Sequence, residues 1–356
     1  VLFVLKDALR GCGVTKVTLN LANQLKEQGH EVGIYIMDNS HAQLEQFQHI
    51  TTFIGNRGGS KGILKYFYHL SRYIKNQNYN LVISAKEQAN ILTFLSSLIN
   101  KSFMPVYTRH SSFDVSEQDL SAESLVKLYS LYGKGRGKIV SVSNDLANYM
   151  KRKIPKIAKK IYCCPNPVVN HTLFEKADNN IDNFSFNKPY MCAVGRLCEP
   201  KGFDLLLKIY RLAMDNNEDI PDLVIVGEGP DLDALKLQCH SLKLESKVFF
   251  TGYMTNPYYI MANSELFLLS SRNEGLPTVL IEALALKKNI VAFDCPTGPD
   301  EILKHGEYGT LIPVGNIQLF AQSINQLLKN RIEIPAKAIE KYTYEKSSNA
   351  YLALVK

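Results

Sequence analysis

The feature that most constrains the fold of this chain is a regular alternation of short apolar runs with stretches of helical periodicity. Val1–Leu5 is an unbroken apolar run, and the apolar residues from Val14 to Leu25 then recur at helical spacing until Gly29 ends the pattern. Further strands are predicted at 31–37, 81–84, 104–108, 138–142 and 160–163, and further helices at 63–76, 88–100, 120–133 and 143–153. This alternation predicts a parallel sheet with helices on both faces.

The same rhythm starts again after Pro165-Asn166-Pro167. Strands are predicted at 190–194, 222–226, 247–251, 265–269, 289–293 and 310–312, and helices at 202–215, 231–242, 256–263, 277–287, 299–304 and 316–329. A chain of 356 residues is also too long for one ordinary core. We therefore predict an α/β protein with two facing, doubly wound Rossmann-like domains, 1–166 and 167–335, and a cleft between them. A last helix, at about 336–356, is expected to pack back on the first domain.

Several features of the composition indicate a cytoplasmic protein. No run approaches the roughly 18 apolar residues that a membrane-spanning helix needs, and Lys6 ends the first apolar run too early for a signal peptide. The chain begins at Val1 rather than at methionine, which leaves room for a few leading residues. Seven cysteines without a C-x-x-C pair suit a reducing compartment and argue against a disulfide framework or a zinc site.

The net charge of +7 is unevenly distributed along the chain. Residues 1–165 carry 22 Lys and Arg against 11 Asp and Glu, a balance of +11, whereas residues 166–356 carry 19 against 23, a balance of −4. Six of the ten residues 151–160 are basic. Because anionic membrane surfaces attract basic side chains, we expect the first domain to dock at the inner face of the cytoplasmic membrane. The alternative is a solvated basic face.

The stretch NEGLPTVLIEAL places Glu274 and Glu282 on a turn that enters a helix. Gly275 permits a tight backbone, and Pro277 suits the first helical position. The amides expected near this helix start are those of Gly275, Leu276, Thr278 and Val279. Helix starts attract anions, and a buried Glu282 would need donors such as ribose hydroxyls. In the alternative interpretation Glu282 pairs with a neighbouring Arg or Lys, and Glu274 is a solvated loop acid.

The stretch GRLCEPKGFDLLL places Arg196 and Lys201 on a turn between a strand and a helix. The guanidinium group of Arg196 and the ammonium group of Lys201 both suit phosphate binding. In the alternative interpretation, this stretch is a solvated basic loop without a ligand. The turns that carry Arg196 and Glu274 both follow strands of one predicted sheet, so a shared anion site at the carboxyl ends of these strands is favoured.

Other candidates carry weaker signals. Gly11 and Gly13 in GCGVTKV would permit close backbone approach to a phosphate or sugar, although Lys16 replaces the third glycine of a dinucleotide fingerprint. His110 ends a predicted strand, and Tyr253 follows Thr251-Gly252. Each of these residues also has a purely structural alternative. The sequence Asp231-Leu232-Asp233 follows Gly229-Pro230 and predicts a helix cap rather than a metal site.

Taken together, these stretches resemble the retaining glycosyltransferases of family 4, which have the GT-B fold. The resemblance covers nearly the whole chain. Its pieces are, in order, GCGVTKVTLNLANQLKEQGHEV, RHSSF, SVSNDL, PNPV, VGRLCEPKGFDLLL, VIVGEGPDLDAL, FTGY, NEGLPTVLIEALALKKNIVAFDCPTGPDEIL and GTLIPVGN. The spacing of Glu274 and Glu282 is the most specific piece. The family commonly has Gly-Gly in the first loop, where this chain has Cys12-Gly13.

The resemblance implies a role for each matching residue. Arg196, Lys201 and the backbone at Gly13 would contact the donor diphosphate, and Glu282 would accept the ribose hydroxyls. The catalytic residues would be Glu274 and His110, which place the donor sugar. The backbone that binds sugar and phosphate would be Gly275, Leu276, Pro277, Thr278 and Val279, and the nucleobase would lie by Gly252 and Tyr253. No metal or other cofactor is implied, because cationic side chains and a helix end would neutralise the leaving diphosphate.

We therefore expect a retaining hexosyltransferase that uses a nucleotide sugar. The EGLPTVLIEAL and CPTGPDEIL stretches are most similar to bacterial members that transfer hexoses or N-acetylhexosamines from UDP, so a UDP-linked donor is predicted. The expected acceptor is a glycan or lipid-linked molecule of bacterial surface polysaccharide or lipopolysaccharide synthesis. Three alternatives stay open: a nucleotide-sugar 2-epimerase of the same fold, a nicotinamide oxidoreductase, and a basic nucleic-acid-binding protein without enzymatic activity.

Overall fold

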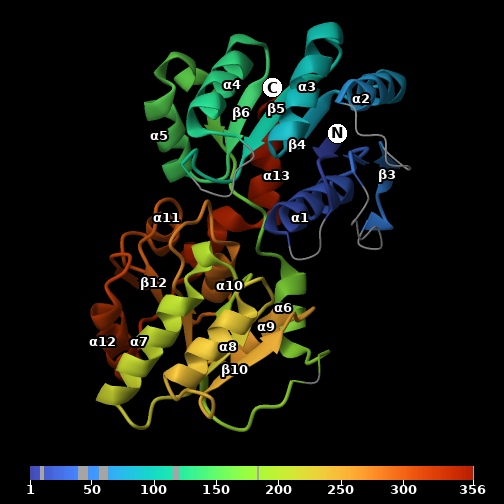
Figure 1. Ribbon diagram of the computed structural model, residues 1–356. Helices are drawn as coiled ribbons and strands as arrows, with labels where there is room; N and C mark the ends of the chain where they lie inside the picture. Colours follow the sequence, from blue (N-terminus) through green and yellow to red (C-terminus); the bar gives the residue numbers. More distant parts are fainter. Residues whose placement is uncertain (9–11, 39–46, 56–62, 115–119, 183, 356) are drawn as a thin grey trace. The chain divides into compact units, whose positions relative to one another are not determined.

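The computed structural model describes residues 1–8, 12–38, 47–55, 63–114, 120–182 and 184–355. The chain forms two compact units (Figure 1). The first consists of Val1–Val168 together with Tyr342–Lys356, and the second of Val169–Lys341. The two places where the chain passes between the units lie side by side, because the Val168 N–H donates to the Tyr342 carbonyl oxygen at 3.0 Å.

The first unit is built on a seven-stranded parallel sheet with the order β3-β2-β1-β4-β5-β6-β7. Its strands are β1 (Leu2–Leu5), β2 (Gly33–Ile36), β3 (Thr51–Ile54), β4 (Leu81–Ala85), β5 (Met104–Arg109), β6 (Lys138–Ser141) and β7 (Ile161–Cys163). Its helices are α1 (Gly13–Glu27), α2 (Ile63–Gln77), α3 (Glu87–Ile99), α4 (Ala122–Lys134), α5 (Asn144–Lys153), the 3-10 helix η2 (Pro155–Lys160) and α13 (Tyr344–Leu352). The strand order reverses between β1 and β4, which makes this position the switch point of the sheet.

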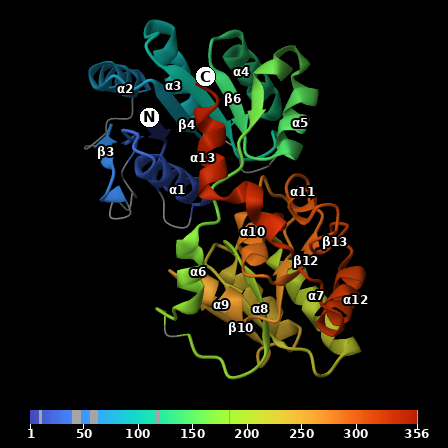
Figure 2. The same ribbon diagram turned by 180° about the vertical axis from the view of Figure 1, so that it is seen from behind.

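Helices cover both faces of this sheet. On one face, Leu25 of α1 and Tyr351 of α13 pack with the sheet residues Leu5 and Ile83. Figure 2 shows α13 beside α1. On the other face, Leu70 of α2 joins a second cluster under the sheet. The chain's last segment therefore completes the core of the domain that its first residues begin.

The prediction of one continuous last helix is wrong. The segment forms the 3-10 helix η4 (Ala336–Tyr342) and then α13. Thr343 separates them because its backbone is extended, with φ −68° and ψ 151°, and its hydroxyl caps α13 by accepting the Lys346 N–H. The edge strand β3 has no counterpart in the predicted pattern, since its four residues TTFI are only partly buried.

The second unit has a six-stranded parallel sheet with the order β10-β9-β8-β11-β12-β13. Its strands are β8 (Tyr190–Val194), β9 (Asp222–Val226), β10 (Val248–Gly252), β11 (Leu266–Leu269), β12 (Asn289–Phe293) and β13 (Thr310–Ile312). Its helices are α6 (His171–Asp178), the 3-10 helix η3 (Glu199–Lys201), α7 (Phe203–Asn216), α8 (Leu232–Ser241), α9 (Pro257–Asn263), α10 (Thr278–Ala285), α11 (Pro299–Leu303) and α12 (Ile317–Lys329). The switch point lies between β8 and β11.

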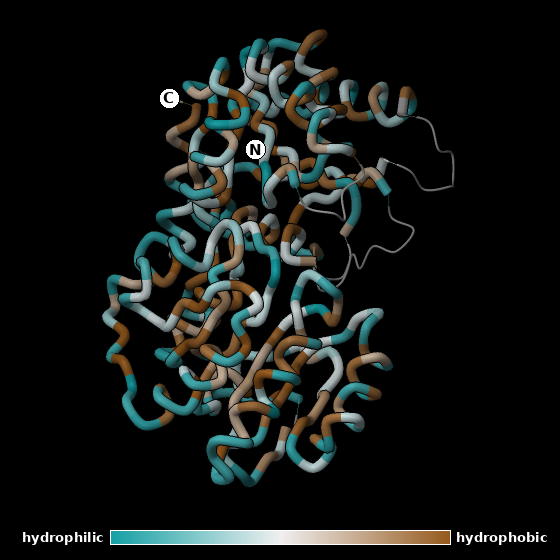
Figure 3. Tube along the Cα trace, turned by 60° about the vertical axis from the view of Figure 1, so that its left-hand side comes forward, coloured by the Kyte–Doolittle hydropathy of each residue, from teal (hydrophilic) through white to brown (hydrophobic). Residues whose placement is uncertain are grey.

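Hydrophobic stretches run through the interior of each unit (Figure 3). In the second unit the core joins Leu206 of α7 and Phe320 of α12 to sheet residues such as Ile225 and Val291. The predicted class, two parallel-sheet Rossmann-like domains, is confirmed. The sequence pattern does not predict α6, although its cap is local: the Asn170 side chain accepts the Leu173 N–H at 3.2 Å. None of the helices that the structure describes is long and apolar enough to cross a membrane.

Candidate active site

The strongest candidate site lies at the switch point of the second sheet. The loop 195–202 leaves β8 and the loop 270–277 leaves β11, and these two strands are neighbours. Both loops therefore emerge at the carboxyl edge, where doubly wound sheets bind their ligands. The two loops that the sequence predicts to share an anion site are thus adjacent.

An ion pair joins the two loops. Nζ of Lys201 lies 2.6 Å from Oε1 of Glu274, and the Ser271 hydroxyl donates to the same oxygen at 2.7 Å. The Glu274 side chain is only 8% exposed and that of Lys201 is 29% exposed, so Glu274 is not a solvated loop acid. Burial lowers the pKa of Lys201, but the Glu274 carboxylate outweighs this effect and holds that pKa above its usual value. The lysine is therefore a fixed cation at this edge of the sheet.

Backbone packing holds the loops together. Gly202 has φ +65°, and a Cβ at this position would lie 2.1 Å from the Ser270 carbonyl oxygen. The Ser270 hydroxyl in turn donates to the Lys201 carbonyl at 3.1 Å. Arg272 spans the same junction, with both of its terminal nitrogens 2.7 Å from the carboxylate of Asp204 in the first turn of α7. A residue with a side chain at position 202 would separate these two loops.

Arg196 lies on the same loop as Lys201 but in a different environment. Its side chain is exposed and makes no hydrogen bond or ion pair with the residues that the structure describes. The backbone on either side of it is fixed: Gly195 N–H donates to Val226, and Leu197 N–H donates to Glu228 at 2.8 Å. Arg196 therefore presents an exposed guanidinium from a loop whose backbone is fixed, five residues before Lys201.

Glu282 is buried in α10, with 2% of its surface exposed. The Tyr258 hydroxyl of α9 lies 3.3 Å from its Oε1. The predicted helix start is wrong by one residue, because α10 begins at Thr278 and Pro277 is its N-cap, with extended backbone. Gly275 to Pro277 form the turn that follows Glu274, and Thr278 and Val279 are the first two residues of this helix.

The loop 294–298, which follows β12, contacts the turn that carries Glu274 and Pro277. The Thr297 hydroxyl donates to the Glu274 carbonyl at 2.6 Å. Gly298 has φ +104°, and a Cβ there would lie 2.6 Å from Cδ of Pro277. Thr297 and Gly298 lie in the stretch CPTGPDEIL and Ser271 lies two residues before NEGLPTVLIEAL, but none of the three was predicted as a site residue. The sequence alone does not indicate these residues, because their contacts with Glu274 and Pro277 depend on how neighbouring loops of the sheet are arranged.

Gly252 is the last residue of β10, which lies two strands from β8, and Tyr253 follows it. The Gly227 N–H donates to the Gly252 carbonyl at 2.9 Å, and the Tyr253 N–H donates to the Glu228 carboxylate at 3.2 Å. The Tyr253 ring is 38% exposed. Glu228, which the sequence reasoning does not single out, therefore joins the loops after β9 and β10. In the same loop as Glu228, Asp231 is the N-cap residue of α8, but its side chain makes no cap hydrogen bond.

The remaining predicted residues lie at the carboxyl edge of the first sheet. Gly13 is the first residue of α1, and a Cβ there would meet nothing within 4 Å, whereas Gly11 lies outside the described residues. Near the switch point of this sheet, Lys86 pairs with Asp7 at 2.7 Å. The candidate residues thus form two groups, with Gly13 and His110 in the first unit and all the others in the second.

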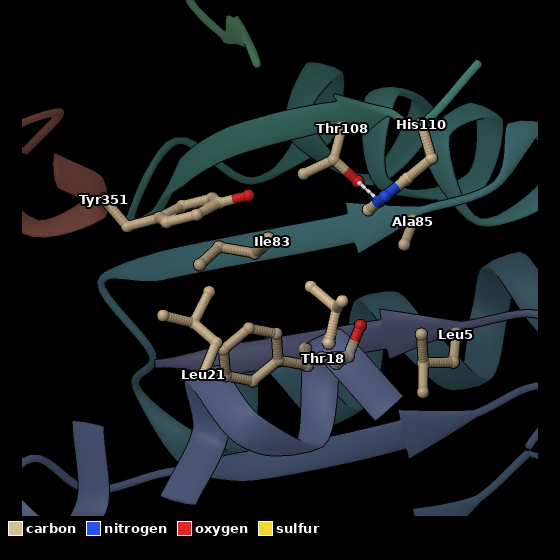
Figure 4. A pocket seen from close by; sticks show the side chains of 10 residues that line it. Leu5, Thr18, Leu21, Ile83, Ala85, Thr108, His110 and Tyr351 are labelled. Atoms are coloured by element: carbon tan, nitrogen blue, oxygen red, sulfur yellow. Dashed lines mark hydrogen bonds between the residues drawn. The ribbon is translucent and has the colours of Figure 1, made fainter. Parts of the chain in front are cut away.

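His110 follows β5 and lines a small, mainly apolar pocket between the sheet, α1 and α13 (Figure 4). Its Nε2 lies 3.0 Å from the Thr108 hydroxyl oxygen. Burial among apolar neighbours lowers the pKa of His110 to about 4, and the positive charges of Arg109 and Lys86 act in the same direction. The imidazole is therefore neutral near pH 7.

Comparisons with known proteins identify the family and agree with the two-domain fold described above. The family model described as Glycosyltransferase Family 4 matches residues 11–170, and the model described as Glycosyl transferases group 1 matches residues 175–346. The HepE protein of Anabaena, solved in complex with UDP and glucose, has the same fold, with a TM-score of 0.81 at 18% identity over 99% of this chain and 98% of HepE. The predicted GT-B fold is therefore confirmed, and the protein is a glycosyltransferase.

More specifically, the chain belongs to the group 1 glycosyltransferases. The amylovoran biosynthesis glycosyltransferase AmsD of Erwinia amylovora is 27% identical over 333 residues, which cover 92% of this chain and 90% of AmsD. A Campylobacter jejuni relative is 33% identical over 182 residues, 48% of each chain. It is named N-acetylgalactosamine-N,N'-diacetylbacillosaminyl-diphospho-undecaprenol 4-alpha-N-acetylgalactosaminyltransferase.

Proposed function

We propose that this enzyme transfers a hexose or N-acetylhexosamine from a UDP sugar, with retention of the anomeric configuration and without a metal cofactor. The observation that carries the proposal is the pairing of Lys201 with Glu274 at the switch point, on a loop that also carries the exposed Arg196. A site that places two cations next to a shielded acid can bind a diphosphate and an adjacent sugar together.

In this proposal the cations hold the donor diphosphate. Arg196 offers a guanidinium fork on a rigid loop, and Lys201 offers an ammonium group. The backbone N–H groups of Leu276, Thr278 and Val279 lie at the start of α10, where they carry partial positive charge. Together these groups would stabilise the negative charge that grows on the leaving diphosphate in an oxocarbenium-like transition state.

Glu274 is then the group that meets the donor sugar. Both hydrogen bonds that fix its carboxylate go to Oε1, from Lys201 and from Ser271. A carboxylate held in this way has acceptor capacity left on its other oxygen for sugar hydroxyls. His110 in the first unit would be the second catalytic residue and would also help to place the sugar, and Gly13 would bring its backbone close to the donor.

The nucleoside would be held by the residues further along the same edge. A buried carboxylate such as Glu282, with Tyr258 as a neutral neighbour, suits the two hydroxyls of a ribose. Gly252 and the half-exposed ring of Tyr253 would flank the nucleobase. The UDP and glucose bound to HepE support the choice of a uridine donor.

The relatives support a role in assembling bacterial surface polysaccharide. AmsD is named for amylovoran biosynthesis, and the Campylobacter relative is named for transfer of N-acetylgalactosamine to a diphospho-undecaprenol-linked acceptor. We therefore propose a glycan or lipid-linked acceptor for this enzyme, bound by the first domain. Lipopolysaccharide or capsule synthesis is the proposed context.

The first domain also carries a surface that suits a cytoplasmic protein docked on the membrane. Leu98 and Ile99 at the end of α3 are 58% and 67% exposed, and Lys101 follows them. Arg136 donates to the carbonyl oxygens of Asn100 and Lys101, which fixes this basic and apolar end. Sedimentation with anionic vesicles at low salt should carry the protein down, and the double variant Leu98→Ser/Ile99→Ser should bind less. Absence of binding by the wild type would end the membrane proposal.

The proposed function is tested by a ligand screen followed by turnover. Thermal-shift measurements with UDP, GDP and ADP and their sugars should show the largest stabilisation with a UDP sugar. Incubation of that donor without an acceptor should leave the sugar unchanged, whereas conversion to its 2-epimer would favour the epimerase alternative. Lys201→Ala and Arg196→Ala should each weaken UDP binding, and unaltered affinity in both variants would contradict the diphosphate site.

A further inference from the structure

The hydroxyl group of Thr108 lies within hydrogen-bond distance of both the Ser84 carbonyl oxygen and the His110 ring. Only one placement of the protons allows both hydrogen bonds at once. Oγ1 of Thr108 is 2.8 Å from the Ser84 carbonyl oxygen and 3.0 Å from Nε2 of His110. A carbonyl oxygen can only accept, so the single hydroxyl proton of Thr108 is donated to Ser84. The contact with His110 then requires a proton on Nε2, which donates to the Thr108 oxygen.

We infer that Thr108 is a positioning residue that fixes His110 as the Nε2–H tautomer and leaves Nδ1 as a hydrogen-bond acceptor for the ligand. In a neutral imidazole one nitrogen donates and the other accepts. Among the described residues His110 has no further hydrogen-bond partner, so the lone pair of Nδ1 is available. Figure 4 shows the Thr108–His110 contact at the end of β5.

The anchor that holds this tautomer is rigid. Thr108 is buried in β5, in register with Ala85 of the neighbouring β4, and Ser84 precedes Ala85. The Ser84 hydroxyl donates to the Asn90 side chain at 2.7 Å, and the Asn90 amide donates to the Thr108 carbonyl at 3.1 Å. Both Ser84 and Asn90 are fully buried. The Thr108 hydroxyl therefore has little freedom to turn its proton toward His110.

The charges that face His110 keep it in the neutral state that the inference requires. Arg109 pairs with Glu87, and Lys86 pairs with Asp7, so both cations stay charged and oppose a proton on the imidazole. Burial in the apolar pocket, and then these two positive charges, account for the lowered pKa of His110. Such a group is a poor general base at neutral pH, because it binds a proton weakly.

The tautomer determines which ligand atoms His110 can meet. A bare Nδ1 accepts a hydrogen bond from a hydroxyl group but repels the oxygen of a phosphate, which carries no proton to donate. The inference rests on the proposed function for the identity of that hydroxyl, which would belong to the transferred sugar or to the acceptor. It assigns His110 to hydroxyl recognition and excludes it from diphosphate binding.

The decisive experiment measures the tautomer in the free enzyme. Long-range 1H–15N spectra of protein labelled with 15N-histidine separate protonated from bare ring nitrogens, and His110→Gln identifies the signals of His110. We expect a protonated Nε2 and a bare Nδ1 in the wild type, a mixture of tautomers in Thr108→Val, and the wild-type pattern in Thr108→Ser. A wild-type proton on Nδ1, or an unchanged pattern in Thr108→Val, would overturn the inference. This measurement needs no donor or acceptor, so it stands even if the proposed transfer reaction fails.

Kinetics provide a second readout once a donor and acceptor support turnover. Thr108→Val should lower kcat/KM by about tenfold, which corresponds to roughly 1.4 kcal/mol, and Thr108→Ser should stay within about twofold of the wild type. UDP affinity should be the same in all three proteins, because His110 does not meet the diphosphate. Equal loss in the Val and Ser variants would show that the methyl group and packing matter rather than the hydroxyl, and would count against the inference.

Discussion

The ion pair between Lys201 and Glu274 predicts an asymmetric response to removal of its two partners. Lys201→Met leaves the Glu274 carboxylate, which is 8% exposed, with Ser271 as its donor at Oε1. Glu274→Gln instead leaves the Lys201 ammonium, which is 29% exposed and can reach water. A buried charge that loses its partner costs more than an exposed one. We expect a loss of about 2–3 kcal/mol in unfolding free energy for Lys201→Met and about 1 kcal/mol for Glu274→Gln.

Urea denaturation of the two variants and the wild type measures this difference, and thermal unfolding should show shifts of roughly 2–4 °C per kcal/mol for a unit of this size. The pH dependence gives an independent check. The folded-state pKa of Lys201 is raised, so its contribution to stability is fully present below the ordinary lysine pKa of 10.5 and is lost as pH rises through the raised value. A Lys201→Met protein as stable as Glu274→Gln would refute the reasoning, because it would mean that Glu274 does not depend on its lysine.

Three further predictions concern other residues of the two sheets. Glu282→Gln should weaken UDP binding at least tenfold in calorimetry, since each charge-assisted hydrogen bond contributes about 1.5–3 kcal/mol, and wild-type affinity would contradict the ribose role. Gly202→Ala should cost about 2 kcal/mol or more in denaturation, because its Cβ would lie 2.1 Å from a carbonyl oxygen, whereas the matched control Gly13→Ala meets nothing within 4 Å and should be tolerated. The unfolding free energy should fall as pH falls from about 6.5 toward 4, where unfolded His110 binds a proton and folded His110 does not, and this slope should flatten in His110→Gln.

The predicted fold agrees closely with the structure because both sheets are parallel and buried. The strand β11 and all of β9 after Asp222 are apolar runs between helices, and this pattern has few alternatives. The exceptions are elements without such a signal. The edge strand β3 is partly exposed, and the short α6 depends on one side-chain cap at Asn170.

The sequence predicted the two loops of the candidate site and their common edge of the sheet, but not the contact between Lys201 and Glu274. Lys201 and Glu274 are 73 residues apart in the chain, and their contact depends on β11 lying next to β8 rather than next to β10. Sequence periodicity does not determine that strand order, because a crossover connection is equally long in either direction. Thr108 and His110 are different, since residues two apart on an extended strand share one face. The pattern Thr-x-His at a strand end was therefore a readable signal for a polar contact.

The discontinuity of the first unit has a consequence for biosynthesis. Residues 169–341 form an insertion whose two ends meet at the Val168–Tyr342 hydrogen bond, so this fragment could be expressed as one continuous piece. The first unit cannot be obtained by stopping the chain at residue 168, because Tyr351 and Leu354 would then be missing from its core. During translation the core formed by residues 1–168 is therefore completed only after residues 342–355 have been made, later than residues 169–341.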